Sequence, residues 1–182
     1  MAQIKTNFLG QDFVFNTGQK LFSPNQIDPG SLLLLETVSK TNLSRSVMDL
    51  GCGWGAMGII LAKLFPKINV MLLDNDPLAI LFAKENIALN KIANVQVFKA
   101  DVIRTNPDKK FDFIITNPPW AKSTSVIPAL INFAHQHLKT GGKFYMVINE
   151  TFKTDGVVKN IFGNVSMPSF RSPYKILLAT KH

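Results

Sequence analysis

An amide, two prolines and an indole directly follow a strand-like apolar run in FDFIITNPPW, residues 111–120. An exocyclic amine is a poor nucleophile because its lone pair is delocalised, and two acceptors aimed at its N–H groups favour a more nucleophilic nitrogen. The Asn117 side-chain oxygen and the Pro118 carbonyl could supply them, and Pro118 and Pro119 would fix the backbone. Trp120 offers a face on which a base can stack, worth about 1–3 kcal/mol. We therefore predict Asn117, Pro118, Pro119 and Trp120 as catalytic residues, although a rigid turn that only ends a strand would also fit them.

A glycine-rich segment, DLGCGWGAMG, begins at Asp49 behind a second strand-like run. Glycine lets a backbone turn tightly and approach a ligand, which would then lie at a helix N-terminus. Gly53, Gly55 and Gly58 fit the dinucleotide pattern G-x-G-x-x-G. Asp49, Gly51, Gly53 and Gly55 fit the D-x-G-x-G-x-G pattern of loops that hold S-adenosylmethionine. Both patterns predict a nucleotide site, and tight strand–helix packing alone is the alternative.

Carboxylates lie at three predicted strand ends, and one of them, Asp49, favours the methyl donor. Asp74 ends the second strand, 23 residues after Gly51, where a carboxylate can accept hydrogen bonds from ribose hydroxyls. Asp49 would be poorly placed beside a pyrophosphate, but it could orient the loop amides or meet a cationic group. Asp101 could accept a hydrogen bond from an adenine amino group, with Val102 beside the ring. An ordinary solvated loop aspartate is an equal interpretation of Asp101.

The elements that must position these residues alternate between strand and helix after residue 45, which predicts a mainly parallel sheet covered on both faces. The first and fourth strands should be central neighbours, so that the glycine loop and Asn117 meet at one crevice. The two closing strands have no helix between them and must form an antiparallel hairpin. We predict strands at 46–50, 68–73, 95–100, 111–116 and 143–149, two more around a turn at Ser172-Pro173, and helices at 31–40, 56–65, 77–90, 125–138 (closed by Gly141-Gly142) and 157–162.

Length and composition bound the class of protein. The 182 residues, 46% of them hydrophobic, suit one globular domain over 1–182, with an N-terminal segment and helix in 1–45 and the core in 46–182. One cysteine, no signal-peptide pattern and no aliphatic run longer than Leu32 to Leu35 indicate a cytoplasmic protein without a membrane segment. Twenty Lys and Arg against 12 Asp and Glu, a net charge of +8, favour a phosphate-rich partner such as RNA over a merely lysine-rich surface. His135 and His137 are two apart on a predicted helix and cannot chelate together, so we predict no metal.

The motifs DLGCGWG, LLDNDP, KADV and TNPPW, in this order, resemble class I S-adenosylmethionine-dependent methyltransferases over about residues 13–180. The N-P-P-aromatic form is similar to those that methylate amino groups of adenine, guanine or glutamine. The segment LFSPNQIDPGSLLLLETV resembles the methyltransferase small domain, known in guanine exocyclic-amine methyltransferases of ribosomal RNA. The bacterial enzymes of this type carry a second, degenerate domain ahead of the catalytic one, which has no counterpart in this sequence, so docking by that route is expected to be absent.

The resemblance implies an α/β, Rossmann-like fold with a seven-stranded, mostly parallel sheet and a C-terminal antiparallel hairpin. It implies S-adenosylmethionine as cofactor, with Asn75 as a further contact, and RNA, above all rRNA, as partner. It also implies that Phe22, Asp28 and Gly30 close over the cofactor or line the substrate side. The alternatives are a protein glutamine N-methyltransferase, an NAD-linked oxidoreductase, which would leave TNPPW without a role, and a non-catalytic RNA-binding module. The sequence makes no prediction of oligomeric state.

Overall fold

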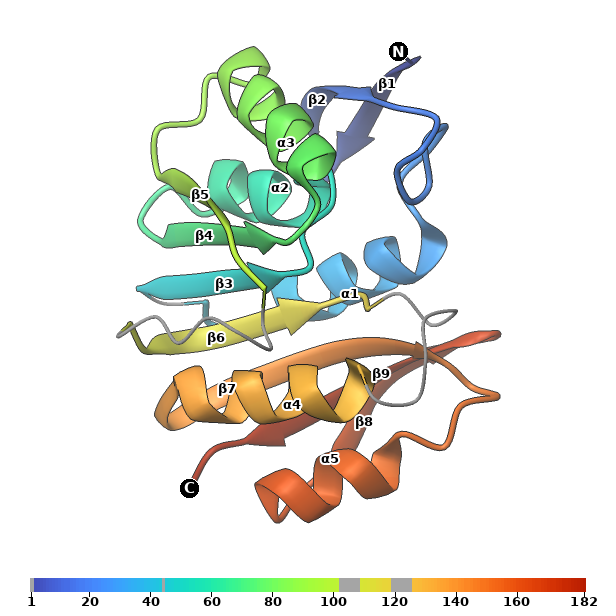
Figure 1. The fold of residues 1–182 in the computed structure, drawn as a ribbon, viewed down its shortest axis with the longest axis vertical. Coiled ribbons are helices and arrows are strands. Elements are labelled where there is room, and N and C mark those ends of the chain that lie inside the picture. Colours follow the sequence, from blue (N-terminus) through green and yellow to red (C-terminus); the bar gives the residue numbers. More distant parts are fainter. Residues whose placement is uncertain (1, 44, 102–108, 119–125) are drawn as a thin grey trace.

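The computed structural model describes residues 2–43, 45–101, 109–118 and 126–182 (Figure 1). Within these ranges seven strands form one sheet in the order β5-β4-β3-β6-β7-β9-β8. The first five are parallel to their neighbours, whereas β9 pairs antiparallel with both β7 and β8. The predicted α/β fold with a C-terminal antiparallel hairpin is therefore confirmed. The strands are β3 (Ser46–Leu50), β4 (Asn69–Asp74), β5 (Val95–Lys99), β6 (Phe111–Thr116), β7 (Leu138–Asn149), β8 (Ser166–Arg171) and β9 (Tyr174–Thr180).

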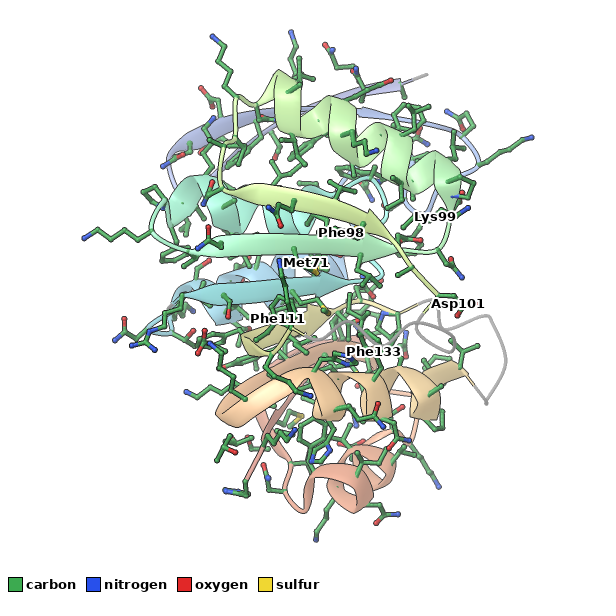
Figure 2. All side chains as sticks on the ribbon, turned by 60° about the vertical axis from the view of Figure 1, so that its left-hand side comes forward. Met71, Phe98, Lys99, Asp101, Phe111 and Phe133 are labelled. Carbon is green, nitrogen blue, oxygen red and sulfur yellow. The ribbon has the colours of Figure 1, made fainter. Side chains whose placement is uncertain are left out.

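Helices cover both faces of this sheet because its central strands are apolar on both sides. On one face lie α1 (Pro29–Ser39), α2 (Ala56–Leu64) and α3 (Pro77–Leu89), and on the other α4 (Val126–His137) and α5 (Asp155–Phe162). Figure 2 shows the second face, where Met71, Phe111 and Phe133 belong to one buried cluster. None of the described helices is long and apolar enough to cross a membrane.

The start of α3 follows the predicted capping pattern. Asp76 is the N-cap, its Oδ1 accepts a hydrogen bond from the Leu78 amide at 2.8 Å, and Pro77 occupies the first turn. Proline fits there because the first amides of a helix have no partner within the helix. This cap fixes where α3 leaves the carboxyl end of β4, beside the predicted cofactor site.

An N-terminal hairpin was missed by the sequence analysis, which expected only a segment and one helix in residues 1–45. Strands β1 (Ala2–Phe8) and β2 (Gln11–Thr17) form a separate antiparallel pair. Two asparagines of α3 hold β2. The Asn90 side chain accepts from the Val14 amide at 3.1 Å and donates to the Val14 carbonyl at 2.7 Å, and Asn86 does the same for Asn16 at 2.7 and 2.9 Å. Residues four apart lie on one side of a helix, so these two amides pair with β2 as a neighbouring strand would.

The prediction that Gly141-Gly142 closes the helix expected at 125–138 is wrong. The helix ends at His137, and both glycines lie inside β7. Gly141 has a φ of +79°, and the pairing of β6 with β7 shifts register between Phe111 and Phe113. Lys181 secures the irregular stretch through its carbonyl, which accepts from the Gly141 amide at 2.7 Å. A glycine with positive φ ends a helix or forms a bulge equally well, so the sequence pattern could not separate the two.

Candidate active site

The glycine loop and the segment at Asn117 lie side by side at one end of the sheet. They follow β3 and β6, which are parallel central neighbours as predicted. The Thr116 hydroxyl at the end of β6 donates a buried 2.7 Å hydrogen bond to the carbonyl of Leu50 at the end of β3. Gly51 directly follows Leu50, and Asn117 directly follows Thr116. This bond therefore holds the two loops in register at the point where strand order reverses, which is where open α/β sheets bind ligands.

Both loops line one cavity of about 270 Å³. The N-terminal segment between β2 and α1 supplies a further wall, and Figure 1 shows this segment at the same end of the molecule as the tip of β6. The cavity has the size and mixed lining of a small-molecule site. The predicted site residues that line it are Gly51, Gly53, Asp74, Asn75, Asn117 and Pro118.

Each glycine of the loop has an identifiable structural task. Gly51, Gly53 and Gly55 have φ values of +74°, +56° and +89°, which other residues rarely adopt. A Cβ built on Gly51 or Gly53 would meet nothing within 4 Å, so the backbone itself borders open space, and Gly55 caps α2. Gly58 acts differently, because a Cβ there would lie 2.1 Å from the Leu72 side chain. Gly51 and Gly53 thus shape a loop that a ligand can approach. Gly55, where a Cβ would lie 3.0 Å from the Ile59 side chain, and Gly58 permit close packing around α2.

Asp74 holds the glycine loop. Its Oδ2 accepts from the Gly53 amide at 2.8 Å and its Oδ1 from the Asp76 amide at 2.9 Å. Each carboxylate oxygen keeps a second lone pair. Asp74 is partly exposed and borders the cavity, as does exposed Asn75, so both can still accept hydrogen bonds from a ligand.

Asp49 lies beneath the loop rather than in the cavity lining. Its side chain is fully buried, and its Oδ2 accepts from the Gly58 amide at 2.8 Å, one turn into α2. Its Oδ1 has no hydrogen-bond partner in the described part of the chain. The pKa of the Asp49 carboxyl is raised from 3.8 to about 7. Burial is the main cause and the Asp74 charge adds to it, whereas the hydrogen bond from Gly58 acts in the opposite direction. Asp49 thus holds one amide of the glycine-rich segment, that of Gly58 at its far end, whereas Asp74 holds the Gly53 amide in the loop itself.

Asn117 is held by residues that are distant in the sequence. Its Nδ2 donates to Asp28 Oδ2 at 2.8 Å and to the Ser31 hydroxyl at 2.9 Å. Because both amide hydrogens have these partners, the amide oxygen remains as the acceptor of this side chain. Pro118 is buried and borders the same cavity.

Some predicted site residues are not placed in this cavity. Asp101 follows Ala100, which does border it, and Figure 2 shows Asp101 just beyond the end of β5. The predicted adenine contact of Asp101 stays a prediction. Val102, Pro119 and Trp120 lie outside the described residues, so their predicted roles beside the adenine ring, in fixing the backbone and in base stacking also stay predictions.

The segment between β2 and the start of α1 forms more of the cavity wall than the sequence indicated. Helix α1 begins at Pro29 rather than at the predicted residue 31, with Asp28 as N-cap. Phe22 borders the cavity with 61% of its surface exposed, and the Trp54 indole donates to the Phe22 carbonyl at 3.0 Å. The Asp-Pro pair at this helix start is the same signal that located α3 and could have found it.

No metal cluster emerges from the described residues, where no three His, Cys, Asp or Glu side chains converge. His135 lies edge-on to Phe162 with ring centroids 4.9 Å apart, while His137 Nδ1 is 2.7 Å from the Phe133 carbonyl oxygen. The two histidines therefore have different neighbours, in line with the expectation from helical geometry.

The sheet order, the glycine loop with Asp74 and the adjoining Asn-Pro segment define a Rossmann-like protein of the class I methyltransferase type. The family described as "Methyltransferase small domain" matches residues 12–178, and the chain belongs to this family.

Similar proteins were found among both sequences and solved structures. The chain is 29% identical to YbxB of Bacillus subtilis (strain 168) over 94% of its own length and 87% of that protein. It is 33% identical to the ribosomal RNA small subunit methyltransferase C of Photorhabdus laumondii, over 94% of the chain and 51% of that protein. The T. thermophilus 16S rRNA N2 G1207 methyltransferase, in complex with AdoMet and guanosine, superimposes with a TM-score of 0.91 at 29% identity, over 100% of the chain and 50% of that one. The chain thus spans about half the length of these two rRNA methyltransferases.

Proposed function

We propose that the protein transfers a methyl group from S-adenosylmethionine to an exocyclic amino nitrogen, that of guanine in ribosomal RNA. The observation that carries the proposal is the placement of two loops in one cavity. The glycine loop with Asp74 forms one wall, and Asn117 and Pro118 form another. An amine between them meets an acceptor side chain on one side and a cofactor loop on the other.

The described residues fit the cofactor. Positive-φ glycines at 51 and 53 border open space, where a backbone can approach a ligand closely. Asp74 and Asn75 present acceptors beside them, suited to ribose hydroxyls. When bound, S-adenosylmethionine supplies an electrophilic methyl group on a sulfonium. Asp49 is fully buried below the loop and does not line the cavity. Its position therefore neither disfavours nor favours a pyrophosphate in the cavity.

The acceptor side supplies alignment and polarity. The Asn117 oxygen and the Pro118 carbonyl can each accept one N–H of the substrate amine, which localises the nitrogen lone pair and turns it towards the methyl carbon. The nitrogen–carbon bond would form as the carbon–sulfur bond breaks, with its electrons going to the sulfur, which leaves as a neutral thioether. The amine needs no strong base beforehand, because its proton becomes acidic only once the nitrogen carries the methyl group, and solvent would then accept that proton. Holding the two reactants in line then accounts for most of the acceleration.

The substrate class is supported by the charge and by the relatives. A net charge of +8 favours a polyanion. The P. laumondii relative is named as a ribosomal RNA methyltransferase, and the T. thermophilus structure is described as an N2 methyltransferase in complex with guanosine. Asn117, held by Asp28 and Ser31, would meet a guanine amino group at this polar wall of the cavity.

The test is methyl transfer from labelled S-adenosylmethionine to undermodified ribosomal RNA, offered naked and in small subunits. We expect label in RNA, as a methylated guanine amino group in a nucleoside digest. Label in protein glutamine would replace the proposal with the protein methyltransferase, and tight binding of NAD without S-adenosylmethionine would replace it with the oxidoreductase. Binding of RNA with no transfer to any cellular RNA or protein would identify a binding module. If the label appears in RNA, mass mapping of nucleosides from cells lacking the protein identifies the target base.

A further inference from the structure

The amide of Asn117 has its orientation set by the start of α1. Its Nδ2 bonds to Asp28 Oδ2 and to the Ser31 hydroxyl, residues that are 89 and 86 positions away in the sequence. A carboxylate can only accept hydrogen bonds, so the amide nitrogen must face Asp28. The amide oxygen is consequently directed away from α1, and Asn117 borders the cavity.

Asp28 is itself fixed from several sides. The same Oδ2 that holds Asn117 accepts from the Ser31 amide at 2.9 Å as the cap of α1. Tyr174, the first residue of β9, lies against it, and the pKa of the tyrosine is raised by burial, by the Asp28 charge and by a hydrogen bond to that carboxylate. Gly30 makes room for this contact, since a Cβ there would lie 2.8 Å from the Tyr174 ring and 2.9 Å from Asp28 Oδ2.

We propose that Asp28, assisted by Ser31, is a positioning residue for methyl transfer, which acts by fixing the amide of Asn117 with its oxygen available to the substrate amine. This rests on the proposed function. A negative charge on the N–H side of an amide also draws electron density onto its oxygen, which makes that oxygen a better acceptor. Asp28 thus sets both the direction and the strength of the acceptor without contact with the reacting atoms. Of the two places expected for Asp28, over the cofactor or on the substrate side, this role corresponds to the second.

Three substitutions, compared with one another, separate this role from helix capping. Asp28→Ala removes the partner of Asn117 together with the cap. Ser31→Ala removes only the hydroxyl, because the cap uses the Ser31 backbone amide. Asp28→Asn keeps a capping oxygen but removes the charge. Asp112→Ala is the matched control, since Asp112 is a partly buried carboxylate that bonds Ser46 and Lys139 near the opposite ends of the strands.

The kinetic test measures kcat at saturating RNA and cofactor. Because misplacement of a reacting partner by about 1 Å can cost about 100-fold, we expect Asp28→Ala to lower kcat about 10- to 100-fold, Asp28→Asn less, and Ser31→Ala a few-fold. The Kd for S-adenosylmethionine and the KM for RNA should stay within about two-fold of the parent. A kcat that merely follows thermal stability across the set, the control included, would overturn the proposal. So would a raised cofactor Kd in Asp28→Ala, which would make Asp28 a cofactor ligand.

A second readout needs no activity. In the full chain labelled with ¹⁵N-asparagine, the side-chain amide signal of Asn117 is identified by its loss in Asn117→Asp. We expect its protons to exchange slowly with solvent in the parent and in Asp112→Ala, and much faster in Asp28→Ala. An unchanged exchange rate in Asp28→Ala would sink the positioning role. If exchange responds as expected but no RNA is methylated, the proposed function fails and the positioning of Asn117 stands.

Discussion

The two walls of the cavity are built in different ways. The cofactor wall is held by backbone amides and a nearby carboxylate, since Asp74 is 21 residues from Gly53 and follows the neighbouring strand. Among the described residues, the acceptor wall is tied to α1 by side-chain hydrogen bonds, with Asn117 bonded to residues 86 and 89 positions away. The first arrangement follows from a strand–loop–helix unit, whereas the second exists only when the N-terminal segment has packed onto the sheet. Substitutions should therefore affect the two walls separately.

The largest effect should come from the acceptor wall. Asn117→Ala removes the acceptor while leaving the glycine loop unchanged, and loss of one polar group that acts in the transition state typically costs about 10²- to 10³-fold in kcat. The cofactor Kd should be unchanged by calorimetry. Asn164→Ala is the control, because this partly buried asparagine makes a comparable set of hydrogen bonds, to Phe162 and Thr180, outside the cavity. Equal losses in the two variants would remove Asn117 from the chemistry.

The support beneath the cofactor wall should respond to pH. Asp49 has a pKa raised from 3.8 to about 7, so the folded state keeps a proton that the unfolded chain releases above about pH 4. Its contribution to stability is full below the unfolded pKa and is lost as pH rises through about 7, an effect on the order of a few kcal/mol. Asp49→Asn, which keeps an acceptor for the Gly58 amide, should flatten the dependence of the unfolding free energy on pH across this window.

Urea unfolding at about pH 4.5, 6 and 7.5 measures that slope. The control is Asp112→Asn. Burial acts to raise the Asp112 pKa, but hydrogen bonds from Ser46 and Lys139 outweigh it, and the net shift is downwards. Its contribution is present above the unfolded pKa and is lost only as pH falls below it, so this substitution should leave the slope between about pH 4.5 and 7.5 unchanged. Parallel curves for Asp49→Asn and the parent would contradict a buried titrating Asp49.

Asp74→Ala should weaken the cofactor wall without moving the acceptor. It removes the partner of the Gly53 amide and an acceptor beside the cavity. Hydrogen bonds to charged groups are worth about 1.5–3 kcal/mol, so the Kd for S-adenosylmethionine should rise about 10- to 100-fold, with a smaller change of kcat at saturation. Asp12→Ala is a control with the same change of charge at an exposed position of the hairpin. A normal Kd in Asp74→Ala would show that the loop keeps its form without this carboxylate.

The smallest effect should come from the hairpin, which touches neither reactant. Asn90→Ala removes both hydrogen bonds to Val14, and we expect a loss of about 1–2 kcal/mol in the free energy of unfolding. Turnover per folded molecule should be unaffected, as measured by kcat below the unfolding transition. A fall in kcat comparable with that of Asn117→Ala would instead mean that the hairpin sets the geometry of the acceptor wall.

The contrast between the walls also explains what the sequence could predict. The alternation of strands and helices, the glycine loop, the place of Asp74 and the cap at Asp76 follow from local patterns of apolar runs, glycine and proline, and all were predicted. The partners of Asn117 depend on a contact between residues 86 and 89 positions apart, about half the length of the chain, which no local pattern encodes. The hairpin was missed because short polar-alternating strands carry a weak signal. The burial of Asp49 was missed because its depth is set by α2 lying over it.

One asparagine joins the N-terminal hairpin to the glycine loop of the cofactor wall. The side chain of Asn86 is completely buried, and its amide nitrogen donates both to the Asn16 carbonyl at 2.9 Å and to the Trp54 carbonyl at 2.8 Å. A shortened form of the chain that starts after β2 would lack Asn16. The Asn86 amide would then lose one of its two acceptors beside Trp54, near the end of the glycine loop. Removing β1 and β2 would thus weaken the support of the glycine loop, which forms the cofactor wall.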